Sequence, residues 1–284
     1  MLELLTEPFA FAFMRNALYA GLATVVASSV IGTWVVLRGM SFMGDALAHG
    51  VLPGIAVAFV VGGNLLVGGA ISAAFMIGGI TLAASRSRLG DDVAIGLLFA
   101  GMLALGVAII SLRGAYAGDL TTILFGEPLG VTQADVRVAV AGAVVVVIAT
   151  LVLYRPFLVL AFSEAKSRAL GMRPTLTHFV LLGLIAGVII VSFRTVGTLL
   201  VFALLVAPPA TAALTSRRVP VMMLVANAFG AVAVLAGLLI SFHLGVATGP
   251  AMAGLSVLGF FVVLAVVEAR AGLVRLRARR PQAA

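Results

Sequence analysis

Almost the whole chain consists of long, uninterrupted apolar runs separated by short polar connections, and this pattern constrains the fold most strongly. Hydrophobic residues make up 63% of the 284 positions and charged residues 10%, whereas an ordinary soluble domain has about 25% charged residues. No soluble fold could bury that much apolar surface. The strands of a membrane barrel are also excluded, because they span about ten residues and alternate in polarity. The sequence therefore predicts an all-α, polytopic transmembrane helical bundle.

The apolar runs predict about nine spans within one membrane domain over residues 1–284. They lie roughly at 12–37, 46–61, 65–84, 93–112, 133–154, 175–193, 197–214, 219–241 and 250–268. The alternative is an eight-span arrangement in which residues 1–37 do not fully cross. The apolar piece 120–125 is too short to span about 30 Å of hydrocarbon, so we expect a short re-entrant or surface helix before the fifth span.

The basic residues indicate which ends of the spans face the cytoplasm. With the C-terminus inside, the inner segments hold most of the 18 Lys and Arg residues, including those of the basic tail 269–284. The outer segments then hold only Arg15, Arg113, Arg137 and Arg194. This bias agrees with the positive-inside rule. We therefore expect a cytoplasmic C-terminus, and the net charge of +8 requires no nucleic-acid partner.

Residues 40–54 introduce an acid and an imidazole into this apolar chain. Asp45 and His49 are four residues apart, and in a helix such positions lie one turn apart on the same face. Both side chains are common ligands of divalent first-row metals, so this spacing would let them reach one ion. The alternative is structural: Asp45 would cap the second helix, and His49 would donate to a backbone carbonyl. The residues alone leave these two interpretations open.

Further metal ligands could come from Asp119, Glu127 or His243. Asp119 and His243 are expected on the outer side, beside short or broken segments. Loop solvation is the simpler explanation of Asp119 and Glu127, and an interfacial position that of His243. His178, near the inner surface, has a weaker case as a ligand. The chain has no cysteine, which excludes thiolate sites.

Glycine is frequent, at 32 of the 284 positions. Gly183 and Gly187 form a GxxxG pair in the sixth span, which predicts close helix packing in lipid. We find no clear internal repeat, and this weighs against a secondary transporter built from inverted repeats.

The polar segment 163–171 connects two spans on the expected inner side. It is either a plain connecting loop or a short docking helix for a soluble partner. The chain lacks the nucleotide motif G-x-x-x-x-G-K-[ST] and the hydrolase motifs H-E-x-x-H and G-x-S-x-G. We therefore do not expect an enzyme, and any ATPase that drives the protein must be another chain.

Four segments together resemble the zinc/manganese/iron permeases of ATP-binding-cassette importers. They occur in the order of that family: residues 43–49 with 52–54, then 120–126, 164–171 and 196–212. Pro208 and Pro209 depart from the pattern, because the family commonly has one proline there. The similarity covers nearly the whole chain and is specific to the family, but not to one metal.

The resemblance implies a homodimeric permease of the bacterial plasma (inner) membrane, with a metal path near the dimer centre. An extracytoplasmic metal-binding protein would deliver the ion. Two cytoplasmic ATP-binding-cassette ATPase subunits would dock on the coupling segment 163–171. The family motif there maps onto Glu164, Ala165, Arg168, Ala169 and Gly171.

The resemblance also favours Asp45 and His49 as the metal site, with Asp119 and His243 as secondary candidates. No permanently bound cofactor is expected, only the transported divalent metal, with zinc placed first and manganese second. The expected mechanism is alternating access driven by ATP hydrolysis in the partner chains. The alternatives are an ATP-driven importer of a larger chelate (siderophore, haem or cobalamin), an ion-coupled secondary metal carrier, and a purely structural membrane subunit.

Overall fold

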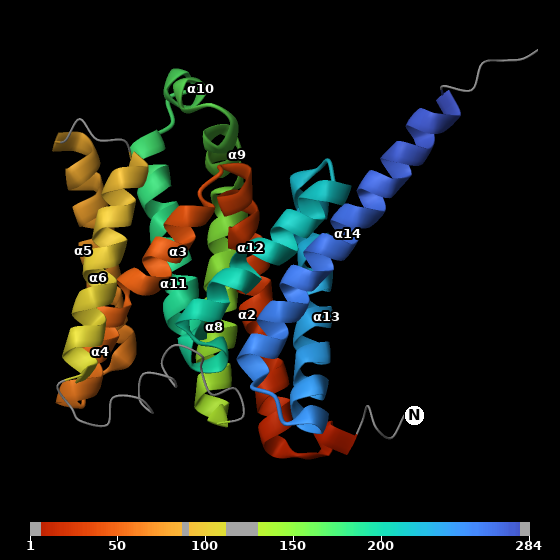
Figure 1. Cartoon of the computed structure of the whole chain (residues 1–284). Helices are drawn as coiled ribbons and strands as arrows, with labels where there is room; N and C mark the ends of the chain where they lie inside the picture. The colour runs from red at the N-terminus through yellow and green to blue at the C-terminus, as the bar shows by residue number, and fades with distance from the viewer. Residues whose placement is uncertain (1–6, 87–90, 112–129, 279–284) are drawn as a thin grey trace, which may run out of the picture.

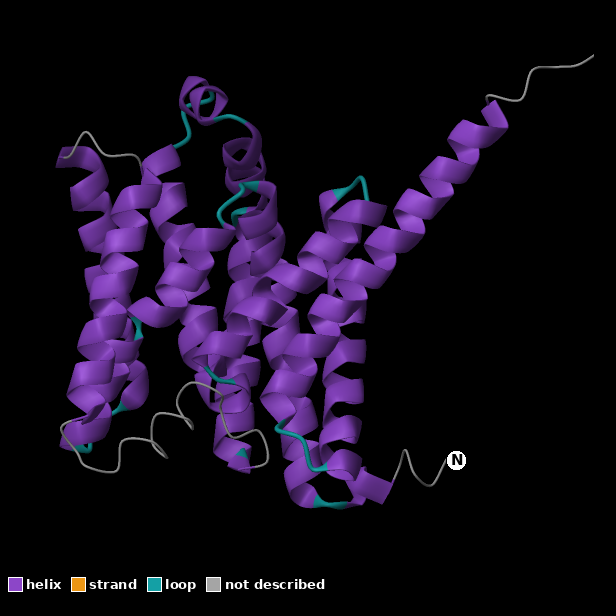
Figure 2. Cartoon of the chain, in the orientation of Figure 1, coloured by secondary structure: helices purple, strands orange, loops and turns teal. Residues whose placement is uncertain are grey.

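The computed structural model describes residues 7–86, 91–111 and 130–278, and every regular element in these ranges is a helix (Figures 1 and 2). The predicted all-α, polytopic bundle is therefore confirmed. The elements are the 3-10 helix η1 (Glu7–Ala10) and the α-helices α2 (Ala12–Leu37), α3 (Ser41–Gly50), α4 (Leu52–Val61), α5 (Leu65–Arg86), α6 (Asp91–Ser111), α8 (Gln133–Val152), α9 (Tyr154–Phe162), α10 (Glu164–Ala169), α11 (Pro174–Val196), α12 (Thr198–Thr215), α13 (Val219–Leu244) and α14 (Thr248–Ala278). The re-entrant helix predicted at 120–125 lies outside the described residues.

Eight segments of the described chain are long and apolar enough to cross a membrane, and α12 contributes a shorter apolar helix. The eight-span alternative placed the incomplete crossing at residues 1–37. Instead, α2 has 26 residues and is the most buried of the eight segments. The shorter helix is α12, which begins only after Gly197, a residue with a φ of 86°. Helix α2 packs against α8, α11, α12 and α13, and is therefore the central helix of the bundle (Figure 1).

Small residues on α2 allow its neighbours to approach closely. A Cβ atom added to Gly32 would collide with the backbone carbonyl of Leu205 on α12. A Cβ atom added to Gly21 would lie 2.8 Å from Val234 on α13. Such backbone-to-backbone proximity is how membrane helices gain packing energy in lipid, where burial of apolar surface no longer drives association.

The GxxxG pair of α11 does not make such a contact. Neither Gly183 nor Gly187 has an atom within 4 Å of an added Cβ, apart from the helix's own backbone. Both line a cavity of about 260 Å³ between α2, α8 and α11. The prediction of close packing at this pair is therefore wrong for the described residues, because the cavity separates this face of α11 from α2 and α8.

The second span is broken in the middle. It begins at Ser41, five residues before the expected start, and consists of α3 and α4, which meet at Val51. Pro53 has no N–H, so it cannot donate to the carbonyl of His49 four residues earlier. The carbonyl of Gly50 accepts a 2.7 Å hydrogen bond from the hydroxyl of Ser72 on α5. The break is thus stabilised from a neighbouring helix, beside the Asp45 and His49 pair.

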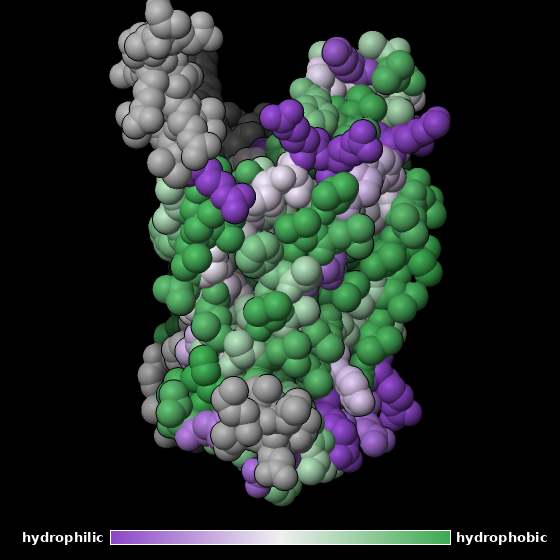
Figure 3. Space-filling model, turned by 90° about the vertical axis from the view of Figure 1, so that its right-hand side faces the viewer, coloured by the Kyte–Doolittle hydropathy of each residue, from purple (hydrophilic) through white to green (hydrophobic). Residues whose placement is uncertain are grey.

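The surface has the polarity expected of a membrane protein. Figure 3 shows a broad hydrophobic belt across the middle of one face, with hydrophilic residues gathered toward its two ends. In Figure 1, α10 lies at one end of the bundle, whereas the α13–α14 connection and η1 lie at the other.

Candidate metal site

Asp45 and His49 are brought together on α3, as their spacing predicts. Asp45 Oδ1 lies 3.7 Å from His49 Nε2, which is too long for a hydrogen bond. The Asp45 side chain is 29% exposed and the His49 side chain only 10%. Two atoms at this separation can both lie about 2.1 Å from one ion if the angle at the ion is about 120°. The geometry therefore suits two ligands of one transition-metal ion.

The contacts required by the structural alternative are absent from the described residues. Asp45 is the fifth residue of α3, whereas the N-cap is Met40, and no side chain caps this end. His49 Nδ1 is buried and has no hydrogen-bond partner among the described residues, so it does not donate to a carbonyl there. Within the described ranges, neither the helix cap by Asp45 nor the donation from His49 Nδ1 that this alternative requires is formed.

One wall of the site comes from Phe99 on α6. The ring of Phe99 stands edge-on to the His49 imidazole, with the ring centroids 4.8 Å apart and an interplanar angle of 89°. Phe99 also contacts Phe42 at 6.2 Å. The aromatic ring restricts the orientation of the imidazole and excludes water from one side of it. Nothing in the apolar sequence of α6 distinguishes Phe99 from other lipid-facing or core residues, so its contact with His49 was not predicted from the sequence.

The pair is an incomplete coordination shell. No group of three or more His, Cys, Asp or Glu side chains comes together anywhere in the described ranges 7–86, 91–111 and 130–278. An ion held here would complete its shell with water, backbone oxygen or a ligand from another chain. A site with two protein ligands binds an ion less tightly than a closed structural site, which favours release.

The other candidates are not joined to this pair. Asp119 and Glu127 lie outside the described residues. His243 is exposed near the end of α13, where its ring contacts Phe242 at 5.4 Å. Figure 1 shows this end of α13 at the opposite end of the bundle from α10. His178 lies on α11, with its Nδ1 2.9 Å from Arg38 Nη1.

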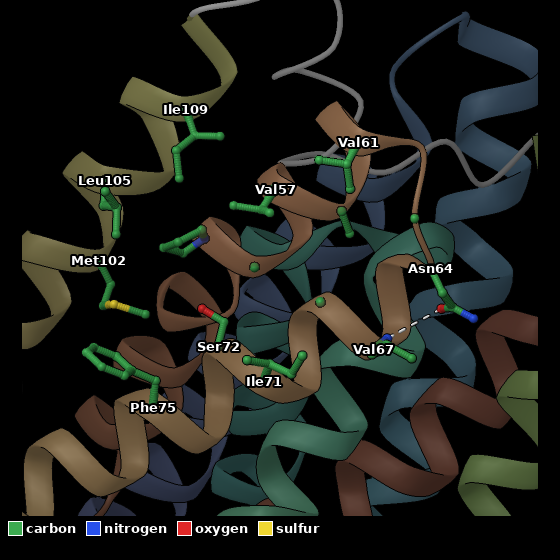
Figure 4. Close-up of a pocket in the computed structure, with 15 residues that line it drawn as sticks. Val57, Val61, Asn64, Val67, Ile71, Ser72, Phe75, Met102, Leu105 and Ile109 are labelled. Carbon is green, nitrogen blue, oxygen red and sulfur yellow. Dashed lines mark hydrogen bonds between the residues drawn. The ribbon is translucent and has the colours of Figure 1, made fainter.

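A groove of about 570 Å³ opens beside the broken span, between α4, α5 and α6. Figure 4 shows its apolar side chains, including Val57, Ile71 and Met102, facing one another, with the Ser72 hydroxyl at the wall. No carboxylate or imidazole lines it. Because an unpaired cation is strongly disfavoured in such surroundings, this groove is not the ion site.

The segment 163–171 contains a short helix, α10. The Ser163 side chain caps it by accepting from the Lys166 N–H at 3.2 Å, and Glu164 pairs with Arg168 at 2.6 Å. Gly171, with a φ of 71°, ends the turn that follows. The side chains of Glu164, Ala165, Arg168 and Ala169 are exposed at this end of the molecule.

Comparison with known proteins gives consistent matches over nearly the whole chain. Residues 10–267 match the family described as "ABC 3 transport family". The chain is 36% identical over 255 residues to the manganese transport system membrane protein MntC of Listeria monocytogenes, covering 89% of this chain and 90% of the relative. It is 35% identical over 264 residues to the chelated iron transport system membrane protein YfeD of Yersinia pestis, covering 93% and 89%. Among solved structures, PsaBC from Streptococcus pneumoniae in complex with Fab matches with a TM-score of 0.86 and 30% identity, covering 93% and 95% of the two chains.

Proposed function

Because the chain belongs to the ABC 3 transport family, we propose that it is the permease of an ATP-driven importer of divalent transition-metal ions, with Asp45 and His49 as ligands of the ion in transit. The observation that carries this proposal is the facing pair of Asp45 and His49, 3.7 Å apart in an apolar bundle. In an apolar span, an acid beside a buried imidazole whose Nδ1 lacks a hydrogen bond in the described part of the chain indicates a functional site.

We propose manganese as the first ion to test. A carboxylate and an imidazole suit Mn²⁺, Fe²⁺ and Zn²⁺ alike, so the two ligands do not select one metal. From the sequence, zinc was expected before manganese. The names of the relatives favour manganese and iron instead, since they describe a manganese system and a chelated iron system.

The proposed cycle is alternating access. An extracytoplasmic binding protein releases the ion to the permease, and Asp45 and His49 replace part of its water shell. ATP binding and hydrolysis in two cytoplasmic ATPase subunits, docked on α10, then tilt the helices and open the site inward. A second copy of the permease completes the assembly. With α10 on the cytoplasmic side, the C-terminal end of α14 is cytoplasmic as well.

Transport by the reconstituted complex tests this proposal. The permease, its ATPase and its binding protein would be placed in proteoliposomes with Mn²⁺ outside and ATP on the ATPase side. We expect Asp45→Asn and His49→Gln each to reduce Mn²⁺ uptake at least about tenfold while assembly is preserved, because each removes one of two ligands. His243→Gln serves as the control and should transport as the wild type does. Normal uptake by both site variants would show that the ion takes another path.

The name of the chelated-iron relative supports one alternative, import of a larger metal chelate. A chelate keeps its own ligands, so its uptake would not depend on Asp45 or His49. The same proteoliposomes loaded with a metal chelate distinguish the two functions. The family assignment favours ATP over an ion gradient as the energy source, and omission of ATP from the assay tests this.

A further inference from the structure

A hydrogen bond at the α10 end of the bundle joins two helices that are far apart in the sequence. Arg38, the first residue after α2, places Nη1 2.9 Å from Nδ1 of His178, the fifth residue of α11. A guanidinium has only donors, so Nδ1 must accept. His178 is therefore neutral in this contact, with its proton on Nε2.

The short helix α10 contributes a charge to the same junction. Burial lowers the pKa of the Arg38 guanidinium, and the nearby Glu164 carboxylate opposes this shift. Glu164 also accepts a 2.6 Å hydrogen bond from Arg168 within α10. The Glu164 carboxylate thus pairs with Arg168 on its own helix and also attracts the half-buried Arg38 at the end of α2.

The last turn of α2 is held by apolar contacts as well. Trp34, one turn before Arg38, is fully buried. Its ring packs against Tyr154 and Phe157 of α9, at centroid distances of 5.5 and 5.7 Å. Residues four apart in a helix share a face, so Trp34, which packs on α9, and Arg38, which bonds to α11, lie on the same side of α2.

This turn leads directly into the helix that carries the metal pair. Only Gly39 and Met40 separate Arg38 from the start of α3. Gly39 has a φ of 65°, and the Met40 N–H donates to the Val35 carbonyl at 2.9 Å, which makes the connection tight. Because the connection is short and hydrogen-bonded, a movement of the end of α2 should displace α3 as well. Asp45 is the fifth residue of α3.

We propose that Arg38 is a positioning residue that links the ATPase-docking helix α10 to the metal pair. Its bond to His178 and its attraction to Glu164 keep the α2–α3 turn in register with α10 and α11. A displacement of α10 then moves Asp45 and His49 along with it. This inference rests on the proposed function and adds to it a residue that transmits the motion.

The reconstituted complex tests this inference through the number of Mn²⁺ ions moved per ATP hydrolysed. We expect Arg38→Ala and His178→Leu each to lower this ratio about tenfold, because each removes the same charge-assisted hydrogen bond. The ATPase rate and the affinity of the permease for Mn²⁺ should each stay within about twofold of the wild type, since the ligands are untouched. The double variant should lose no more than either single variant, because both act on one contact.

Two further variants separate positioning from a general structural role. His178→Gln keeps an acceptor for the guanidinium and should recover most of the ratio. Arg173→Ala removes an exposed cation at the start of α11, five residues before His178. This variant should move as many Mn²⁺ ions per ATP hydrolysed as the wild type does. If Arg38→Ala does not fold, His178→Leu and His178→Gln carry the same test from the other side of the contact.

An unchanged ratio in Arg38→Ala and His178→Leu, beside a wild type that transports Mn²⁺, would overturn this inference alone. Loss of Mn²⁺ binding in these variants would also overturn it, because Arg38 would then act on the site itself. A wild-type complex that moves no Mn²⁺ would overturn the proposed function, and this inference with it.

Discussion

At the scale of single residues, the site contains a buried imidazole, His49, with a ring nitrogen that lacks a hydrogen-bond partner among the described residues. His49 Nδ1 is buried without a hydrogen bond in the described part of the chain, and Nε2 faces Asp45 at 3.7 Å. An unsatisfied buried polar atom typically destabilises a protein by about 1–3 kcal/mol. An imidazole at this position therefore stabilises the fold less than an apolar side chain would, but it can act as a ligand of a transported cation.

The unsatisfied nitrogen of His49 leads to a prediction for the stability of a His49→Leu variant. Leucine has a similar size and no polar atom, so we expect the metal-free variant to unfold at the same temperature as the wild type or a higher one. Mn²⁺ should raise the unfolding temperature of the wild type, because a ligand that binds only the folded state stabilises it. That increase should vanish in the variant. Thermal unfolding in detergent, with and without Mn²⁺, measures both effects. A marked loss of stability in the metal-free variant would mean that His49 serves the fold.

Phe99 should affect the site without being a ligand. Its edge-on contact with His49 is of a kind worth about 0.5–1.5 kcal/mol, so Phe99→Leu should weaken Mn²⁺ binding roughly two- to tenfold. Phe75→Leu, in the apolar groove between α4, α5 and α6, is the matched control and should leave the affinity unchanged. Calorimetric titration of the purified permease with Mn²⁺ compares the two. Equal affinities in both variants would show that the ring does not orient the imidazole.

At the scale of elements, α2 organises the bundle through close backbone contacts. Its Gly32 packs against the carbonyl of Leu205 on α12. Pro209 has no N–H to donate to that carbonyl, four residues earlier, so the helix-internal partner is missing at this point. The approach of Gly32 therefore covers a backbone oxygen that the second proline of α12 leaves without its usual donor.

Two glycine-to-alanine substitutions, one at a tight contact and one at an open position, test this packing. Gly32→Ala places a methyl group against a backbone carbonyl, and overpacking of this kind costs about 1–3 kcal/mol or more. We expect a lower yield of folded protein and a lower unfolding temperature. Gly183→Ala adds the same methyl group where no atom lies within 4 Å, so it should be tolerated. Size-exclusion profiles and unfolding temperatures show whether the Gly32 variant is less stable than the Gly183 variant. A tolerated Gly32→Ala would mean that α2 and α12 are farther apart than this.

The sequence predicted the helices better than their contacts. Long apolar runs located the spans, because hydrophobic length is a local property. The break at Val51 and the earlier start of α3 were not predicted, although Pro53 was a visible signal. The packing of the GxxxG pair was predicted wrongly, because a small residue shows that a helix can approach but not that one does. The Arg38–His178 contact was not predicted, since the two residues are 140 positions apart.

At the scale of the whole molecule, both ends of the bundle are polar, but basic residues are more numerous at the α10 end. The α10 end carries exposed ionised side chains such as Arg168 and Glu164. The opposite end carries the α13–α14 connection, with Val246 among its exposed residues. From the positive-inside rule we expect the α10 end to face the cytoplasm. The Asp45 and His49 pair could be recognised from the sequence, whereas its walls depend on which helices meet in three dimensions.

Labelling of single cysteines tests this orientation, and the absence of native cysteine makes the experiment direct. Ala165 on α10 and Ala247 in the α13–α14 connection are both exposed. A membrane-impermeant maleimide should label Ala165→Cys only in inverted membrane vesicles and Ala247→Cys only in spheroplasts. The opposite pattern would reverse the assignment of both ends.

Pulsed EPR of Mn²⁺ bound to the purified permease tests the central claim most directly, that Asp45 and His49 hold the ion. The chain has 3 histidines, His49, His178 and His243, so each can be replaced in turn. We predict a nitrogen hyperfine coupling from one imidazole, which disappears in His49→Gln and persists in His178→Gln and His243→Gln. Asp45→Asn should weaken Mn²⁺ binding while leaving the nitrogen coupling in the fraction that still binds. A coupling that survives His49→Gln would place the ion elsewhere and contradict the account.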